Sequence, residues 1–256
     1  MKATRTSEAS SRGQKTALPP ASSESEVEEG AVHERVYTRL RDLIISGQLS
    51  PGQALSLRSI ARDFDVSAMP AREAIRRLAT AGALEINDTR RVSVARVSQD
   101  RLEQIRVARL SLEPEIARRA VRRVRQSARQ KKLLVDTLLK HDQMLDASIA
   151  AGDINGYAKY NSDFHFELYR AAESDVIFGL IESLWLQFGP TMRIVLGRMG
   201  TINFVEDLHK EAIAAVRAGD EDGVSAAIHA DIKHGLDTLC GESTRTGDLS
   251  AGLPRR

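Results

Sequence analysis

Apolar side chains recur every three or four residues from Ala31 onward, which is the spacing of an amphipathic helix. The pairs Ser46-Gly47 and Pro51-Gly52 would end this first helix. Two shorter helical patterns follow, and each is preceded by a serine suited to an N-cap, Ser56 and Ser67. The pattern therefore predicts three helices, the last two of which meet across a tight turn.

The periodicity changes after Gly82, where apolar and polar residues alternate on both sides of Asn87-Asp88-Thr89. A period of two, interrupted by turn residues, predicts a small β-hairpin. Three helices followed by a hairpin is the order of elements in a winged helix-turn-helix. In that arrangement the third helix enters the major groove of double-stranded DNA, and the hairpin, or wing, reaches the flanking backbone.

Beyond Ser98 every apolar pattern is helical, with breaks expected at Gly152, Ser174 and Gly200 and at the Ala218-Gly219-Asp220 junction. The expected helices lie near residues 100–125, 129–150, 153–173, 175–197, 203–218 and 220–240. The predicted fold class is therefore mainly α: an N-terminal winged helix-turn-helix with a small β-hairpin, followed by an all-α helical bundle.

The two ends of the chain differ from the rest in composition. Residues 1–30 and 242–256 are rich in small and polar residues and contain few large apolar side chains, so both are expected to be disordered tails. Between them we expect a DNA-binding domain over residues 31–97 and an all-helical effector-binding and dimerisation domain over residues 98–241.

Cysteine content and the length of apolar runs bear on the cellular setting. The single cysteine, Cys240, cannot form an intramolecular disulfide bond, which is typical of a reducing compartment. No stretch approaches the roughly 18 consecutive apolar residues of a membrane span. We therefore expect a cytoplasmic protein without a membrane partner.

Basic residues are in excess in the predicted winged helix. Residues 31–97 contain 11 Lys and Arg against 7 Asp and Glu, whereas residues 98–241 contain 19 against 21. A positive excess is what a module that binds DNA phosphates needs. The candidate DNA contacts are Arg58, Ser67, Ala68, Met69, Arg72, Arg76, Arg90 and Arg91. Arg72 is the best placed of them for a base edge or a phosphate, although any single arginine could equally belong to a solvated surface.

Four polar residues of the predicted bundle lie on otherwise apolar helix faces. Asn161 and His165 are one turn apart on the same face. His209 and Asp231 point inward from two later helices. If these groups converge they form a divalent metal site, and imidazole with carboxylate suits Zn²⁺, Ni²⁺ or Mn²⁺ better than Ca²⁺. The alternative is four separate core polar groups, because spacing alone does not prove convergence.

The run from Val36 to Val94 resembles the GntR family of regulators. The motifs that carry the resemblance are Leu49-Ser50-Pro51-Gly52, Val66-Ser67, Pro70-Ala71-Arg72-Glu73-Ala74-Ile75-Arg76-Arg77-Leu78 and Ala81-Gly82-Ala83-Leu84. The resemblance implies a homodimer on a short pseudo-palindromic operator. The positions that it places at the DNA are Arg58, Ser67, Arg72 and the wing. The chain departs from the family at Ala68-Met69, where Arg-Thr or Arg-Ser is frequent, and at Arg91, where glycine is frequent.

Residues 98–240 resemble the FCD domain, the all-helical ligand-binding domain of the FadR-like branch of that family. The motifs are Arg109-Leu110-Ser111-Leu112-Glu113-Pro114, Asn161-Ser162-Asp163-Phe164-His165, Leu168-Tyr169-Arg170-Ala171-Ala172 and His209-Lys210-Glu211-Ala212-Ile213. Metal-binding members have an aspartate and a histidine where this chain has Asn161 and Asp231, so one formal negative charge is retained. The resemblance therefore implies a metal site of altered composition, to which an effector carboxylate could add a ligand.

Guanidinium groups bind carboxylates through two parallel hydrogen bonds, which makes Arg109 and Arg193 candidate contacts for an acidic effector. The leading hypothesis is a ligand-responsive transcription regulator, a repressor that leaves its operator when a small organic acid binds. A metal-dependent enzyme in the helical domain and a constitutive architectural DNA-binder are the alternatives. Titration of small carboxylates against operator binding separates the three, because they predict release, turnover and no response respectively.

Overall fold

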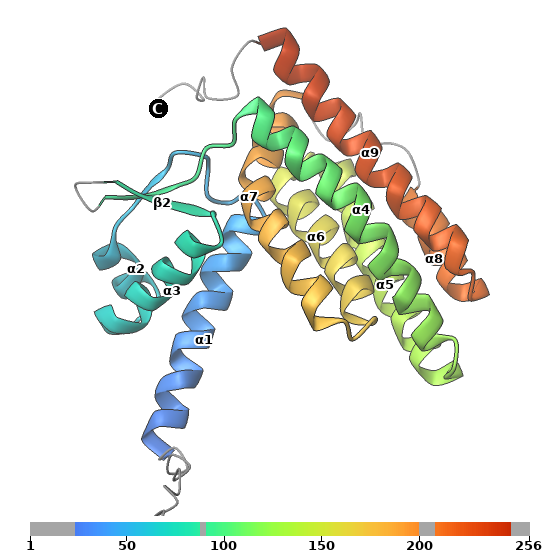
Figure 1. The fold of residues 1–256 in the computed structure, drawn as a ribbon, viewed down its shortest axis with the longest axis horizontal. Coiled ribbons are helices and arrows are strands. Elements are labelled where there is room, and N and C mark those ends of the chain that lie inside the picture. Colours follow the sequence, from blue (N-terminus) through green and yellow to red (C-terminus); the bar gives the residue numbers. More distant parts are fainter. Residues whose placement is uncertain (1–23, 88–90, 200–207, 247–256) are drawn as a thin grey trace, which may run out of the picture.

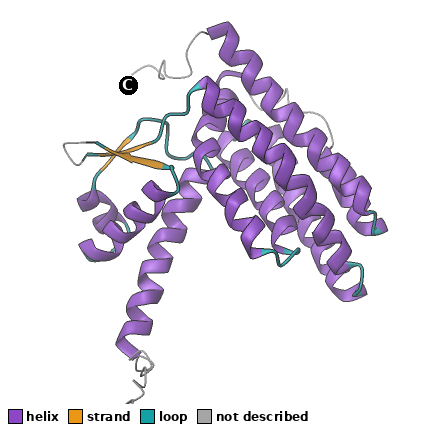
Figure 2. Cartoon of the chain, viewed as in Figure 1, coloured by secondary structure: helices purple, strands orange, loops and turns teal. Residues whose placement is uncertain are grey.

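The computed structural model describes residues 24–87, 91–199 and 208–246, with side chains over 30–87, 91–192 and 208–237. The N-terminal part is a small domain of helices with a sheet, and the rest is a bundle of long helices (Figure 1). All strands of these described ranges lie in the small domain (Figure 2). The predicted fold class is confirmed. The predicted features that lie outside the described residues are Arg90, the side chain of Arg193, the break at Gly200, residues 203–207 of an expected helix, and the tails over residues 1–23 and 247–256.

Three helices build the small domain, and they are α1 (Glu24–Ile45), α2 (Leu57–Asp63) and α3 (Ala68–Thr80). The hydroxyl of Ser56 caps α2 by accepting a hydrogen bond from the backbone N–H of Ser59. Ser67 occupies the N-cap of α3, but its hydroxyl makes no capping bond. Between the two helices Asp65 has a φ of 52°, a left-handed conformation that aspartate tolerates better than most residues. This residue makes the tight turn possible.

The sheet has three antiparallel strands in the order β1-β3-β2, which are β1 (Ala54–Leu55), β2 (Leu84–Ile86) and β3 (Val92–Val94). In the central strand, Val92 pairs with Leu55 on one side and with Ile86 on the other. The hairpin of β2 and β3 is as predicted. Strand β1 was not expected, because two residues are too few to show an alternation of apolar and polar positions.

In the described part of the bundle there are six helices, and they are α4 (Gln99–Val124), α5 (Ala128–Ala151), α6 (Ile154–Arg170), α7 (Asp175–Met199), α8 (Leu208–Ala218) and α9 (Glu221–Thr246). Figure 1 shows α4 running beside α9, and α5 packs along α6. The predicted break at Gly152 is a left-handed C-cap with a φ of 65°. None of the helices in the described ranges is both long enough and apolar enough to cross a bilayer.

The predicted boundaries between the tails and the neighbouring helices are wrong at both ends of the chain. Helix α1 begins at Glu24 rather than at Ala31, and α9 continues to Thr246 instead of ending at residue 240. The acidic run before Ala31 has Val27 as its one large apolar residue but is rich in glutamate, a good helix former whose charge is favourable near a helix N-terminus. A helix already anchored by its apolar face can therefore extend into a polar segment.

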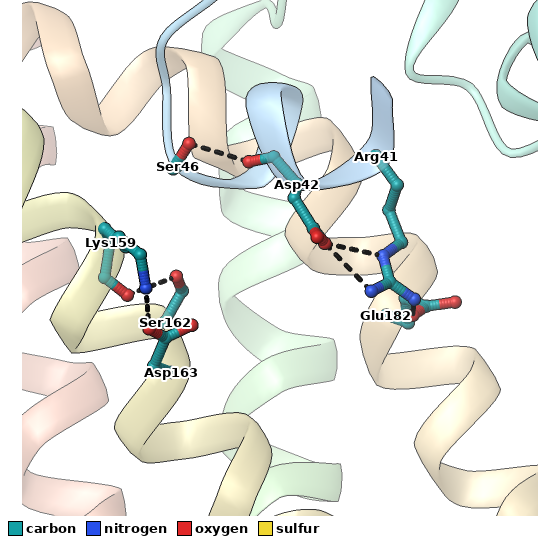
Figure 3. A network of polar contacts seen from close by, with 7 residues as sticks. All are labelled: Arg41, Asp42, Ser46, Lys159, Ser162, Asp163 and Glu182. Atoms are coloured by element: carbon teal, nitrogen blue, oxygen red, sulfur yellow. Dashed lines mark hydrogen bonds and ion pairs between the residues drawn. The ribbon is translucent and has the colours of Figure 1, made fainter. Parts of the chain in front are cut away.

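Helices α1 and α7 form the contact between the small domain and the bundle. A methyl group added at Gly189 of α7 would lie 2.4 Å from the carbonyl oxygen of Ile45, so the two helices meet at backbone distance and only glycine fits. The Arg41 guanidinium, which also donates to Asp42, forms an ion pair with Glu182 at 2.9 Å (Figure 3). Buried residues of the two parts form one continuous core.

Candidate DNA interface and metal centre

Helix α3 buries one face against α1 and leaves the other in solvent. Its buried residues are Pro70, Ala71, Ala74, Ile75 and Leu78. Every predicted DNA contact that the structure describes is exposed, namely Arg58, Ser67, Ala68, Met69, Arg72, Arg76 and Arg91. Met69 is 60% exposed, and an apolar side chain at the start of a recognition helix can contact the methyl group of a thymine.

The exposed arginines differ in their existing partners. Arg58 and Arg72 make no ion pair or hydrogen bond with another described residue, so their guanidinium groups are available. Arg76 already donates to both carboxylate oxygens of Glu73, at 2.6 and 2.9 Å. The carboxylate offsets the charge of Arg76, which leaves Arg72 as the strongest candidate contact on α3.

The wing is closed by hydrogen bonds between Asn87 and Arg91. The backbone N–H of Asn87 donates to the carbonyl of Arg91, and the backbone N–H of Arg91 donates to the Asn87 side-chain oxygen at 2.8 Å. The Arg91 side chain is left exposed. The position that often holds glycine in the family thus presents a cation at the wing.

Three of the four predicted metal ligands come together in the bundle, from α6, α8 and α9. Ligand atoms of His165, His209 and Asp231 lie within 4.8 Å of one another. His165 Nε2 is 3.1 Å from Asp231 Oδ2, and His209 Nε2 is 3.9 Å from Asp231 Oδ1. Asn161 lies one turn before His165 on α6 and is buried. The two imidazoles and the carboxylate therefore converge as the metal hypothesis requires.

His209 is the most isolated polar group of this centre. Both ring nitrogens are buried without a hydrogen-bond partner among the described residues. The ring stacks on Phe164 with centroids 3.9 Å apart and planes 7° from parallel. Burial lowers the pKa of His209 to about 4, so the ring is neutral at physiological pH. A neutral, unpartnered imidazole is in the form that a metal ion binds.

Asp231 carries the negative charge of the centre. Burial by itself would raise the pKa of Asp231, but the close contact with the His165 ring and the positive charges nearby lower it to about 2. The side chain nevertheless remains 25% exposed between two imidazoles that are each at least nine-tenths buried. The carboxylate is therefore ionised and is reached by solvent.

A buried hydrogen-bond network supports His165 from behind. The Tyr169 hydroxyl donates to Glu113 at 2.7 Å and lies 2.9 Å from His165 Nδ1. Trp185 Nε1–H also donates to Glu113, at 3.1 Å. Since the only hydroxyl proton of Tyr169 is directed to Glu113, Tyr169 must accept a hydrogen bond from His165 Nδ1–H. A neutral His165 therefore carries its lone pair on Nε2, facing Asp231.

Arg109 is occupied by Glu113, its neighbour one turn along α4. The guanidinium donates to both carboxylate oxygens of Glu113, and both residues are buried. The guanidinium carbon of Arg109, Cζ, lies 4.4 Å from the ring centroid of Trp185 and 4.5 Å from that of Phe188, which are cation–π contacts. The expected bidentate contact of Arg109 with an effector is thus made to an internal carboxylate, because that carboxylate is already one turn away.

Residues around the candidate metal centre that sequence reasoning missed are Glu113, Tyr169, Trp185 and Asp142, the last with its Oδ1 3.9 Å from His209 Nδ1. Tyr169 and Glu113 could have been predicted from the sequence, because Tyr169 lies four residues after His165 and Glu113 lies four residues after Arg109. Such spacing places polar partners on one helix face. Trp185 and Asp142 come from other helices, and no local spacing predicts them.

Acid is expected to destabilise the metal-free protein through His209. The folded protein keeps this ring neutral until its pKa of about 4, whereas the unfolded chain takes up a proton near 6.5. Stability present above pH 6.5 is therefore lost as the pH falls towards 4, by at most about 1.4 kcal/mol per pH unit. Urea unfolding at several pH values measures this slope. The variant His209→Phe keeps a ring on Phe164 and should show a shallower slope, whereas equal slopes would contradict the assignment.

A winged helix-turn-helix with available arginines, joined to a bundle around a buried polar centre, defines a DNA-binding transcription regulator with a sensor domain. Residues 32–94 match the family model of bacterial regulatory proteins of the gntR family, and residues 104–234, just over half of the chain, match the FCD domain. The chain belongs to the GntR family of bacterial transcription regulators and carries an FCD effector-binding domain. Both predicted resemblances are confirmed.

Curated relatives include the transcriptional regulator McbR and the transcriptional repressor RspR of Escherichia coli K12. McbR is 25% identical over 195 residues, which are 74% of this chain and 84% of McbR. RspR is 25% identical over 197 residues, 77% of this chain and 84% of RspR. The gluconate operon repressor of Bacillus subtilis 168 is 29% identical over 158 residues, 62% of this chain and 60% of that protein.

Solved structures share the fold. The structure of McbR/YncC from Escherichia coli has a TM-score of 0.75 at 22% identity, and a regulator from Rhodococcus sp. RHA1 has 0.64 at 20%. Each comparison covers 82% of this chain and 98% of the other. Both domains are therefore included in the similarity.

Proposed function

We propose that the protein is a homodimeric repressor that binds a pseudo-palindromic operator and is released by a small organic acid bound beside a divalent metal ion. One observation carries the metal part of this proposal. His165 Nε2 and Asp231 Oδ2 are 3.1 Å apart, yet the proton of a neutral His165 lies on the other nitrogen, towards Tyr169. Two lone pairs would then face each other across this distance. A second proton on the ring or a metal ion resolves the conflict.

The donor set fits a metal ion. Two imidazoles and a carboxylate are ligands for Zn²⁺, Ni²⁺ or Mn²⁺, and the carboxamide of Asn161, buried one turn before His165, would add a weak oxygen ligand. Both ring nitrogens of His209 are without a hydrogen-bond partner in the described structure, so Nε2, the nitrogen on the side of Asp231, is available to an ion. When bound, the metal would supply positive charge that attracts an effector carboxylate. The exposed part of Asp231 indicates the side from which an effector would reach the centre.

Helix α7 connects this centre to the DNA-binding domain. Trp185 donates to Glu113, and Phe188 packs on Arg109 next to the centre. On the same helix, Glu182 and Gly189 contact α1 of the DNA-binding domain. An effector that binds better to one position of α7 would therefore also favour one position of α1. In a homodimer, such a shift changes the distance between two recognition helices that must fit successive major grooves.

The metal part of the proposal is tested with full-length protein stripped by a chelator and titrated with ZnCl₂, NiCl₂ or MnCl₂ by calorimetry. One equivalent per chain is expected for the wild type. His165→Ala and His209→Ala are each expected to lower the affinity at least about 100-fold, because a three-residue ligand set loses an imidazole. The control is His229→Ala, an exposed histidine of α9 two residues from Asp231, which should leave affinity unchanged. A wild-type protein that binds none of the three ions would contradict the proposal.

The regulatory part is tested by titrating acetate, citrate and gluconate against the complex of metal-loaded protein with its operator. Release of DNA by one of these acids supports a repressor that responds to an effector. Chemical conversion of the acid would instead support an enzyme. No response to any carboxylate in a wider panel would support an architectural DNA-binder.

A further inference from the structure

Asp142 of α5 is a buried carboxylate beside the candidate metal centre that none of the considerations above assigns. It is 5% exposed, and its Oδ1 lies 3.9 Å from His209 Nδ1. On the opposite side of the same ring, Asp231 Oδ1 lies 3.9 Å from His209 Nε2. The imidazole thus lies between two carboxylates, one near each nitrogen.

We infer that Asp142 is a positioning residue of the metal centre, which accepts a hydrogen bond from His209 Nδ1–H and so directs the Nε2 lone pair to the metal. This inference rests on the metal part of the proposed function. A neutral imidazole has one N–H, and both flanking carboxylates can only accept it. A histidine that binds a metal through one ring nitrogen almost always donates a hydrogen bond from the N–H of the other nitrogen to a carboxylate, a carbonyl or a water. Asp142 is the carboxylate on the side of His209 away from Asp231.

The two histidines would then be oriented by the same principle. His165 donates its Nδ1–H to Tyr169, which in turn donates to Glu113, and this leaves Nε2 facing Asp231. With Asp142 as the acceptor, His209 also carries its proton on Nδ1 and presents Nε2 to the same carboxylate. Both imidazoles would therefore offer the nitrogen that a shared ion requires.

The separation of 3.9 Å is longer than a hydrogen bond, so the ring must move by about 1 Å towards Asp142 or bond through a water molecule. Stacking on Phe164 favours the first route, because two rings 7° from parallel resist tilting but allow a slide within the ring plane. The charge balance also favours this role. Asn161 stands where a carboxylate is usual, and Asp142 adds a second negative charge to that of Asp231 near a divalent ion.

Asp146 provides a matched control on the same helix. It lies one turn after Asp142, carries the same charge and influences His209 electrostatically. It is 52% exposed, however, and forms an ion pair with Lys210 at 3.2 Å. A general effect of negative charge would appear in both Asp142→Asn and Asp146→Asn, whereas an effect of orientation would appear only in the first.

The experiment measures Zn²⁺ affinity of full-length wild type, Asp142→Asn and Asp146→Asn by competition with a chelator. Asp142→Asn is expected to weaken Zn²⁺ binding about 10- to 100-fold, and Asp146→Asn by less than about twofold. If the wild type binds Zn²⁺ and Asp142→Asn binds it with the same affinity, the inference is overturned and the proposed function is unaffected. Failure of the wild type to bind Zn²⁺, Ni²⁺ or Mn²⁺ would overturn both.

A second measurement does not depend on the folding of a variant. Long-range ¹H–¹⁵N NMR spectra of the metal-free wild type distinguish the two neutral forms of a histidine, and the His209 signals are assigned by their loss in His209→Gln. The inference requires the Nδ1–H form for His209. Finding the Nε2–H form would overturn it.

Discussion

Replacing Arg72 by alanine is expected to abolish specific operator binding. Arg72 is exposed on the first turns of α3 and has no partner among the described residues, so its five N–H donors are available to a base edge or a phosphate. One arginine contact contributes about 1–3 kcal/mol of discrimination per half-site. Ala68 supplies no polar contact that could substitute for it. A dimer would lose the contact twice, about 2–6 kcal/mol, which is a large share of the roughly 4–10 kcal/mol that separate specific from nonspecific binding.

The measurement is a fluorescence anisotropy titration at fixed salt, with a duplex selected by the wild-type protein from a random pool. Arg119→Ala is the control, since Arg119 is an exposed arginine of α4 paired with Glu115. Circular dichroism should show the wild-type helix content and melting curve for both variants. Unchanged affinity in Arg72→Ala would count against the docking of α3 in the groove.

The second large effect is expected from Glu113→Ala. Glu113 is fully buried and accepts hydrogen bonds from Arg109, Tyr169 and Trp185. Its removal leaves the Arg109 guanidinium charged and without its partner in the core. Breaking a buried ion pair in this way costs about 3–5 kcal/mol, a large share of the roughly 5–15 kcal/mol by which domains are stable. We therefore expect a loss of about that size in the free energy of unfolding.

Urea denaturation measures the loss, and Glu115→Ala is its control. Glu115 pairs with Arg119 at the same four-residue spacing on the same helix, but both side chains are at least 40% exposed. Its loss should cost less than about 1 kcal/mol. Replacing both members of the buried pair, as in Arg109→Met with Glu113→Leu, should restore part of the stability, because the unpaired charge of Arg109 is removed while the donors of Tyr169 and Trp185 stay without an acceptor. Equal losses in the two single variants would show that burial does not strengthen the Glu113 pair.

The sequence predicted elements whose signal is local. Helical spacing, serine caps and the Gly152 break placed the helices with small errors at their ends, and the hairpin followed from its alternation. The error at Glu24 has a physical cause, since a polar segment gives no periodic signal even when it extends a helix anchored elsewhere. Strand β1 is formed by pairing with β3, a partner distant in sequence.

The candidate metal centre was predicted in part. Inward orientation could be derived for His165, His209 and Asp231 from helix periodicity, and the structure brings these three together. The pairing of Arg109 was not anticipated, because an arginine on a buried face suggests a ligand until its own neighbour at the next turn is considered. Asp142 could not be predicted at all, since only the packing of α5 against α8 brings it to His209.

The close approach at Gly189 also determines how much freedom the regulator has. A protein whose two domains were joined through long side chains could absorb a small movement of the sensor by changing rotamers. Here the backbones of α1 and α7 are in contact at Gly189, so no side chain lies between them there that could adjust its rotamer. A displacement of α7 by a fraction of an ångström would have to be passed to the DNA-binding domain or not occur. Under the proposed function, the side chains around the candidate metal centre could therefore differ with the effector while this contact between the backbones of α1 and α7 stays the same.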